Sequence, residues 1–285
     1  MTDEHPRTDA QHIPALRLLP EILVAILAFH AEANPTNLDR SDIDIPEGMT
    51  LAQFRLGWIT ITHVCSLWRH VALGHCTLWT HHVFNLGLEW TTEMLHRARG
   101  APLKLTFSEQ VVPYPPSEDN VTNVIPKLLH LVDTLTIKGK ACTGAVLDTL
   151  TLPAPLMCSL TISAGRLTVL PRALFGDVVP NFHHLFLSNA LPTWTSVALT
   201  CLKSLSITLD HNIGISNMPS YADLFSALQT MHNLESLFLT GCIPFDPCHF
   251  EQKVQLPKLR SLLLRYHGRQ VFAKSLNILN LRPRP

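Results

Sequence analysis

A short repeated pattern is most complete in the stretch Leu234-Glu235-Ser236-Leu237-Phe238-Leu239-Thr240-Gly241-Cys242. Its centre is Leu-x-Leu, with another leucine three positions earlier. The same centre, ending in Leu or Ile, recurs along the chain and begins at Leu103, Leu135, Leu160, Leu185, Leu205, Leu237 and Leu262. The intervals between these positions are 32, 25, 25, 20, 32 and 25 residues. Repeats of this period indicate stacked units that cannot bury their apolar faces alone.

The repeating pattern resembles the leucine-rich repeat, in which L-x-x-L-x-L is followed by Asn or Cys. The stretch 234–242 matches in full, whereas the other repeats have at the Asn/Cys position Ser108, Lys140, Gly165, Ala190, Asp210 and His267. The resemblance implies an irregular solenoid over residues 101–281, with one strand of a curved parallel sheet per unit. Segments 142–150 and 221–231 would be helical or irregular returns. The alternative is a set of unrelated buried strands in an ordinary α/β domain.

The first hundred residues have a different, helical pattern. Residues 1–17 are polar, and we expect them to be disordered. Pro20 suits a first helical turn, and the apolar positions 22, 23, 26 and 27 form a helical stripe. The range 31–57 contains five acids and is expected to be an exposed acidic loop. A second helical pattern begins at Trp58, and the sequence suggests a pair of short helices that end in Trp68 and Trp79.

The order of these pieces is more specific than their periodicity. Leu18-x-Pro20-Glu21-Ile22-Leu23, then Val64-Cys65-x-x-Trp68-Arg69, then Leu78-Trp79 resembles the F-box. This short helical motif docks on the adaptor of Skp–cullin–F-box ubiquitin ligases. The following segment, with Pro102-Leu103-Lys104-Leu105, is similar to fungal-type members of the family. The resemblance covers residues 18–105 and implies an F-box-like helical module over residues 18–100. The chain departs from the family pattern at Leu19, where a proline is usual, and in the acidic insertion 31–57.

Together the two resemblances imply an α/β protein without enzymatic activity. It would be the substrate-recognition subunit of a Skp–cullin–F-box ubiquitin ligase: it would bind a Skp-type adaptor, and through it a cullin scaffold, and hold an unidentified target protein on the repeats. The implied adaptor-binding or F-box core residues are Leu18, Pro20, Ile22, Leu23, Ile26, Val64, Cys65, Trp68, Leu78 and Trp79. The sequence does not separate adaptor contacts from core, and we expect Leu23→Asp with Ile26→Asp to abolish adaptor binding without changing the fold. In the alternative, the repeats form an interaction scaffold and the F-box-like hairpin is only its N-terminal cap.

Charge is balanced in total but unevenly placed. The chain has 22 basic and 22 acidic residues, which argues against a dedicated nucleic-acid binder. Residues 1–57 carry nine acids and four bases, whereas residues 251–285 carry one acid and eight bases. The basic end could attract an acidic partner through Arg260, Arg265 and Arg269, or it could be solvated surface charge. We expect the last residues, 282–285, to form an extended tail.

The sequence offers little support for catalysis or metal binding. The 16 histidines invite a hydrolase or metal-enzyme hypothesis, but no metalloprotease, phosphate-loop or nucleophile-elbow motif occurs. Cys242, Cys248 and His249 lack a clear fourth ligand for zinc. We therefore predict no cofactor. Seven scattered cysteines, no recognisable signal peptide and no long apolar stretch predict a cytoplasmic or nuclear protein without a membrane partner.

Overall fold

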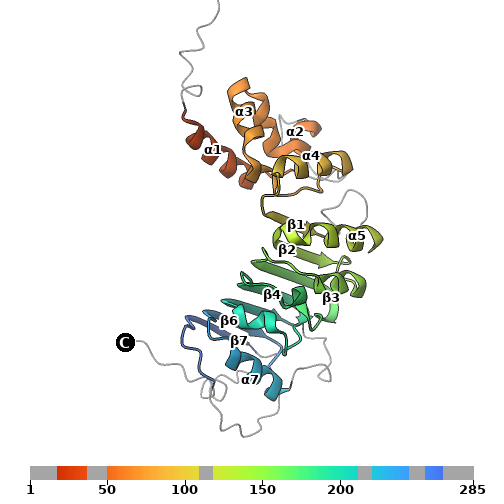
Figure 1. Ribbon diagram of the computed structural model, residues 1–285, viewed down its shortest axis with the longest axis vertical. Coiled ribbons are helices and arrows are strands. Elements are labelled where there is room, and N and C mark those ends of the chain that lie inside the picture. Colours follow the sequence, from red (N-terminus) through yellow and green to blue (C-terminus); the bar gives the residue numbers. More distant parts are fainter. Residues whose placement is uncertain (1–17, 37–49, 109–117, 211–219, 244–253, 266–285) are drawn as a thin grey trace, which may run out of the picture. The chain divides into compact units, whose positions relative to one another are not determined.

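The computed structural model describes residues 18–36, 50–108, 118–210, 220–243 and 254–265 (Figure 1). The chain divides into two compact units, Met1–Ala101 and Pro102–Pro285. The described part of the first unit is mainly helical, and the second contains a seven-stranded, all-parallel sheet, so the protein is of the α/β class. None of the described helices combines the length and apolar character that a bilayer crossing requires. The ranges predicted to be a disordered N-terminus, 1–17, and a tail, 282–285, lie outside the described residues.

A buried tryptophan organises the first unit, whose elements are α1 (Pro20–Ala33), α2 (Leu51–Leu56), η3 (Gly57–His63), α3 (Ser66–Gly74), η4 (Cys76–Trp79) and α4 (Leu88–Ala98). The Trp79 indole donates from Nε1 to the carbonyl of Ala72 at 2.9 Å. The ring of Trp58 meets it edge-on, with the ring centroids 4.9 Å apart, and the Arg97 guanidinium lies 4.3 Å from its centroid. Trp79 therefore ties α3, η3 and α4 together and satisfies its own polar group.

The second helical pattern is divided differently from the prediction. Trp68 lies inside α3, which continues to Gly74, so the predicted helix end at Trp68 is wrong. The segment before it, η3, is a 3₁₀ helix with Trp58 and Ile59 buried. Apolar spacing alone did not distinguish one helix from two segments joined at Val64-Cys65.

The predicted exposed loop 31–57 is wrong at both ends. Residues 31–33 belong to α1, and Thr50 closes a capping box with Gln53 that starts α2. The N–H of Trp58 donates to the carbonyl of Asn34 at 2.8 Å, so the chain is held together on both sides of the insertion. Only residues 37–49 of the predicted loop lie outside the described residues. This hydrogen bond holds the residues on either side of the long insertion next to each other, so we call the pair Asn34 and Trp58 the base of the insertion.

The strands of the second unit follow one another in sequence order across the sheet. They are β1 (Leu103–Phe107), β2 (Val132–Gly139), β3 (Ser159–Val169), β4 (His184–Leu191), β5 (Ser204–Thr208), β6 (Ser236–Thr240) and β7 (Ser261–Arg265). The predicted leucines face one another in register from Leu135 through Leu160 to Leu262. The first repeat is the exception, because Leu105 rather than Leu103 pairs with Leu135 and a bulge follows Leu103.

The described helical segments between strands cover one face of this sheet. They include α5 (Glu118–Leu128), η5 (Leu129–Leu131), α6 (Gly144–Asp148), η6 (Thr149–Thr151), η7 (Leu174–Asp177), η8 (Val197–Cys201) and α7 (Tyr221–Thr230). Consecutive connections from α5 to α7 contact one another and form a second layer (Figure 1). The segments 142–150 and 221–231, predicted to be helical or irregular returns, are helical, with α6 and η6 in the first and α7 in the second. Leu160 and Leu185, on the covered face, are fully buried, whereas Phe186, on the other face, is exposed.

A single asparagine ties three consecutive turns of the second unit. Asn189, in β4, adopts a left-handed backbone with φ of 52°. Its Nδ2 donates to the carbonyl of Ala164 at 3.2 Å and to Oδ2 of Asp210 at 2.6 Å, and its Oδ1 accepts from the N–H of Asp210 at 2.9 Å. The repeat pattern in the sequence placed Ala190 at the Asn position, one residue away from Asn189. The structure therefore provides one buried asparagine link that the sequence pattern missed.

Candidate docking surface

Helix α1 has apolar residues on two neighbouring sides, one buried and one exposed. Leu23 and Leu27 are fully buried and contribute to the core of the first unit. On the other face, Ile22 is 48% and Ile26 is 38% exposed. The apolar positions 22, 23, 26 and 27, which the sequence combined into one stripe, therefore belong to two faces. A surface helix normally keeps only one apolar face, toward the core.

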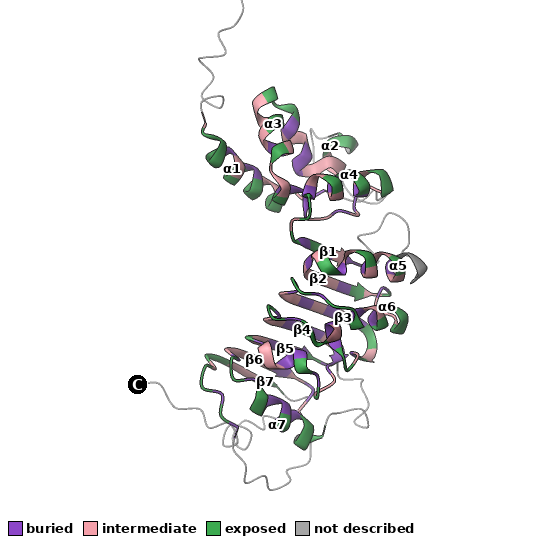
Figure 2. Cartoon of the chain, viewed as in Figure 1, coloured by how far each residue is buried: buried purple, intermediate pink, exposed green. Residues whose placement is uncertain are grey.

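The outer face continues beyond these two isoleucines. Leu19, immediately before the helix, is 63% exposed, and Phe29 is 75% exposed. The four side chains have spacings of three, four and three residues, which place them along one side of a helix. We call Leu19, Ile22, Ile26 and Phe29 the α1 stripe; exposed positions follow the helix in Figure 2. No charged residue occurs between Glu21 and Glu32, so the outer side of α1 is apolar over most of its length.

The start of α1 is normal despite the residue that precedes it. Leu19 is the N-cap in an extended conformation, Pro20 occupies the first helical turn, and Glu21 follows. Proline lacks the N–H group that the first turn of a helix leaves unpaired, so Pro20 suits this position. The helix therefore begins here with leucine, and not proline, at position 19. The departure at Leu19 thus adds an exposed apolar side chain to the stripe and does not shorten the helix.

The structure divides the ten predicted residues by exposure. Leu23, Leu78 and Trp79 are buried and belong to the core. Pro20, Ile22, Ile26 and Val64 are exposed, whereas Leu18, Cys65 and Trp68 are intermediate. The expectation that Leu23→Asp leaves the fold intact is contradicted by the burial of Leu23. Leu19 and Phe29 were missed, although Leu19 lies three residues before Ile22 and Phe29 three residues after Ile26, a helical spacing that was a usable signal.

The open face of the sheet in the second unit has a mixed character. One row across it reads Thr106, Thr136, Thr161, Phe186, Ser206, Phe238 and Leu263 in successive paired strands. Hydroxyl side chains form the first half, and apolar side chains dominate the second. The ring of Phe186 stacks on that of His184, with centroids 6.4 Å apart and planes at 8°. The open face therefore has an aromatic cluster near its middle.

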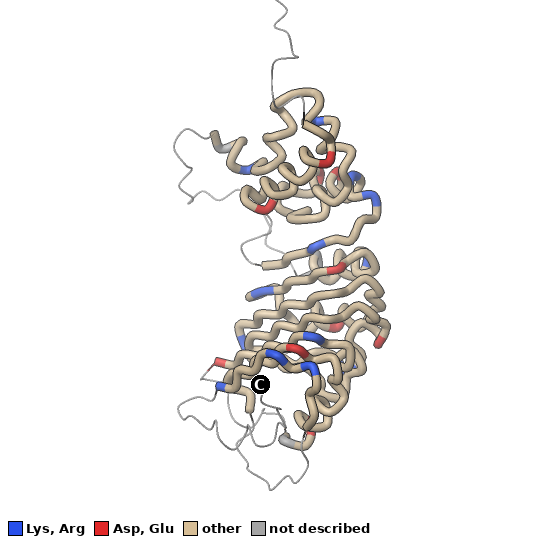
Figure 3. Tube along the Cα trace, turned by 90° about the vertical axis from the view of Figure 1, so that its left-hand side faces the viewer, with Lys and Arg blue, Asp and Glu red and all other residues tan. Residues whose placement is uncertain are grey.

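The predicted basic residues only partly form a basic surface. Arg260 is exposed and lies 3.7 Å from a carboxylate oxygen of Glu235, and Arg265 is exposed at the end of β7. Figure 3 shows basic and acidic positions together at this end of the sheet. Arg269 lies outside the described residues. The described arginines therefore do not amount to a patch of one sign.

The titratable residues of the described chain give little basis for metal chemistry. Among the described residues, no group of three His, Cys, Asp or Glu side chains is placed to hold a metal ion. Burial raises the pKa of the Cys242 thiol to about 12, so this side chain is a neutral core group at physiological pH. Cys248 and His249 lie outside the described residues. All six described cysteines are free thiols.

Comparison with known proteins adds no assignment: no family model, no curated protein and no solved structure matches the chain.

Proposed function

We propose that the first unit is an F-box-like module that docks on a Skp-type adaptor, and that the second unit is a leucine-rich-repeat-like receptor for a target protein. The chain would then be the substrate-recognition subunit of a Skp–cullin–F-box ubiquitin ligase. It would supply proximity and orientation, while the bond-making chemistry would belong to other subunits. The observation that carries the proposal is the α1 stripe, which lies within the motif that resembles the F-box.

The stripe has the chemistry of a helix-in-groove anchor. Such helices present apolar side chains at i, i+3, i+4 and i+7 to a hydrophobic groove. Full burial of one Ile, Leu or Phe side chain is worth about 1.5–3 kcal/mol. The stripe residues are partly exposed in the free chain, so docking would recover part of that value for each of them. A few such anchors normally dominate the affinity of an interface.

The two departures from the family pattern are compatible with docking. α1 begins at Pro20 despite Leu19, and the hydrogen bond between Trp58 and Asn34 closes the base of the insertion. Asn85 reinforces this base by donating from Nδ2 to the carbonyl of Thr36 at 2.6 Å. These two hydrogen bonds hold the described residues on either side of the insertion against the first unit.

The second unit supports a binding role through its open sheet face. Parallel sheets are usually covered on both faces, but here the connections that the structure describes cover one face, and Phe186 is 38% exposed on the other. Seven in-register strands present a continuous array of hydroxyl and apolar side chains. A target protein would bind by covering this array, and the aromatic cluster at Phe186 and His184 would be a natural anchor.

The direct test is reconstitution from purified components. The full chain is mixed with a Skp-type adaptor and analysed by size-exclusion chromatography with light scattering. The proposal predicts a stoichiometric one-to-one complex that binds a cullin N-terminal domain in turn. If the chain and the adaptor elute separately at concentrations of about 10 μM, a range in which specific interfaces of this type are occupied, the scaffold alternative with a capping hairpin is favoured.

A further inference from the structure

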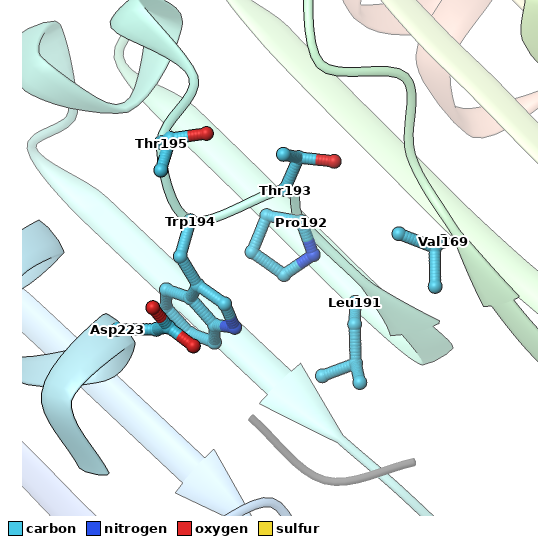
Figure 4. A pocket seen from close by; sticks show the side chains of 7 residues that line it. All are labelled: Val169, Leu191, Pro192, Thr193, Trp194, Thr195 and Asp223. Carbon is cyan, nitrogen blue, oxygen red and sulfur yellow. The ribbon is translucent and has the colours of Figure 1, made fainter. Parts of the chain in front are cut away.

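A pocket lies within the second unit at the carboxyl ends of β3 and β4. Its volume is about 320 Å³, at the small end of the range for ligand sites. Val169 and Leu191, which end the two strands, form apolar walls with Pro192 (Figure 4). The remaining lining residues are Thr193, Trp194, Thr195 and Asp223. Val169 is 59% exposed, so the pocket opens to solvent.

The pocket has one formal charge and one aromatic ring. Asp223, in the first turn of α7, contributes the carboxylate, and Trp194 contributes the indole. The Ser220 hydroxyl donates to Oδ2 of Asp223 at 2.7 Å and accepts from the Asp223 N–H at 3.1 Å, so the acidic side chain is held in place. No ion pair joins Asp223 to another described residue. No basic side chain of the described part of the chain therefore neutralises its negative charge.

These groups favour a cation over an anion or a neutral polar ligand. The electron-rich face of an indole attracts cations, and a carboxylate pairs with them. The Thr193 hydroxyl donates to the carbonyl of Leu170 at 2.7 Å, so its proton is not available to an anion. The apolar walls suit a methylene stem, which long basic side chains carry below their charged heads.

We propose that this pocket receives an arginine side chain of a protein partner. The planar guanidinium stacks on Trp194 and directs its N–H groups toward Asp223, which the compact ammonium of lysine does less well. The methylene stem packs on Val169 and Leu191. A free small cation would gain little from so open a pocket, whereas an arginine within a polypeptide gains further contacts from the surrounding surface. The inference does not depend on adaptor docking, because all seven lining residues belong to the second unit.

The test uses the full chain labelled with 5-fluorotryptophan and followed by fluorine NMR. The chain has five tryptophans, and Trp194→Phe assigns the signal of interest. The probe is a short glycine–serine peptide with one central arginine. Matched peptides carry lysine, norleucine or glutamate at that position. The Trp194 signal should shift saturably with the arginine peptide, less with lysine and norleucine, and not with glutamate.

Two variants locate the charge that matters. Asp223→Asn should weaken arginine-peptide binding by about threefold, the scale of a solvent-accessible ion pair. Ser220→Ala removes the hydroxyl that caps α7 but keeps the carboxylate, and it should bind the arginine peptide more tightly than Asp223→Asn does. The proposal is overturned if the Trp194 signal does not shift, if norleucine binds as well as arginine, or if Asp223→Asn binds like the unmodified chain.

Discussion

Ile22 and Leu23 are adjacent in α1, about 100° apart around the helix axis, and differ in exposure: Ile22 is 48% exposed, whereas Leu23 is fully buried. Substitution of Leu23 therefore tests the stability of the first unit, and substitution of Ile22 tests what the unit can bind. A double variant of Leu23 and Ile26, which the sequence suggested, would confuse the two effects, because an aspartate at a buried leucine position unfolds its surroundings. Substitution of Ile22 and Ile26, which are both exposed, tests binding without disturbing the core.

The first prediction concerns stability on the two faces of α1. Leu23→Ala should lower the free energy of unfolding by about 2–5 kcal/mol, the usual result of emptying a buried leucine site. Ile22→Ala should cost about 1 kcal/mol or less because that side chain is half in water. Urea denaturation followed by tryptophan fluorescence reports mainly on the first unit, which has four of the five tryptophans. Equal losses in the two variants would contradict the assigned faces.

The second prediction concerns the base of the insertion. Gly57 has φ of 52°, and a Cβ atom there would lie 2.3 Å from the carbonyl oxygen of Pro35. Gly57→Ala should therefore destabilise the first unit by about 2 kcal/mol or more, from backbone strain and the clash together. Gly74→Ala is the matched control, because a Cβ atom there meets nothing within 4 Å. Thermal unfolding should show a lower Tm for the first variant only.

The third prediction concerns the asparagine link across three turns. Asn189→Ala removes the hydrogen bond to the carbonyl of the buried Ala164 and the two hydrogen bonds to the exposed Asp210. The expected loss is about 2–4 kcal/mol. Asn181→Ala is the control, because the exposed Asn181 makes only a 3.4 Å contact to the carbonyl of Pro155. Chemical denaturation followed by circular dichroism gives the unfolding midpoint of each variant. A similar midpoint for the two variants would show that the hydrogen bonds of Asn189 do not stabilise the second unit.

The fourth prediction concerns alkaline pH. Burial raises the pKa of Cys242 from 9.0 to about 12, so the unfolded chain loses this proton before the folded chain does. The contribution of the protonated Cys242 thiol to the free energy of unfolding is thus complete below pH 9. It is lost as pH rises from 9 toward 12, by up to about 1.4 kcal/mol per pH unit. Cys242→Ala should have a flatter fall in unfolding free energy between pH 9 and 10.5. Parallel curves for the two proteins would show that the thiol is not buried.

The repeat pattern predicted the sheet well because it encodes a two-residue alternation that is physically decisive. Once Leu135 and Ile137 face the covered side, the neighbouring strands must align their own leucines with them. The alternation does not fix the register of the first strand, because Leu103, Leu105 and Phe107 all satisfy it. The bulge after Leu103 selects the register, and no local sequence signal marks it.

The candidate sites were less predictable because both depend on contacts distant in sequence. Periodicity identified α1 but could not tell its buried side from its exposed side, since that depends on how η3, α3 and η4 pack against the helix. Trp194 carried no signal of its own. Its chemistry arises only when the end of β4 approaches the first turn of α7 and the indole shares a pocket with Asp223.

The most direct test of adaptor docking compares the α1 stripe with exposed apolar residues elsewhere. The dissociation constant of the adaptor complex is measured by isothermal titration calorimetry for the unmodified chain, for Ile22→Asp with Ile26→Asp, and for the control Leu88→Asp with Val197→Asp. All four positions are exposed, so each variant should keep its far-UV circular dichroism. Docking through the stripe predicts affinity at least about 100-fold weaker in the first variant, from two anchors worth about 1.4 kcal/mol or more each, and unchanged affinity in the control. Unchanged affinity in the stripe variant would show that the adaptor does not dock on the α1 stripe.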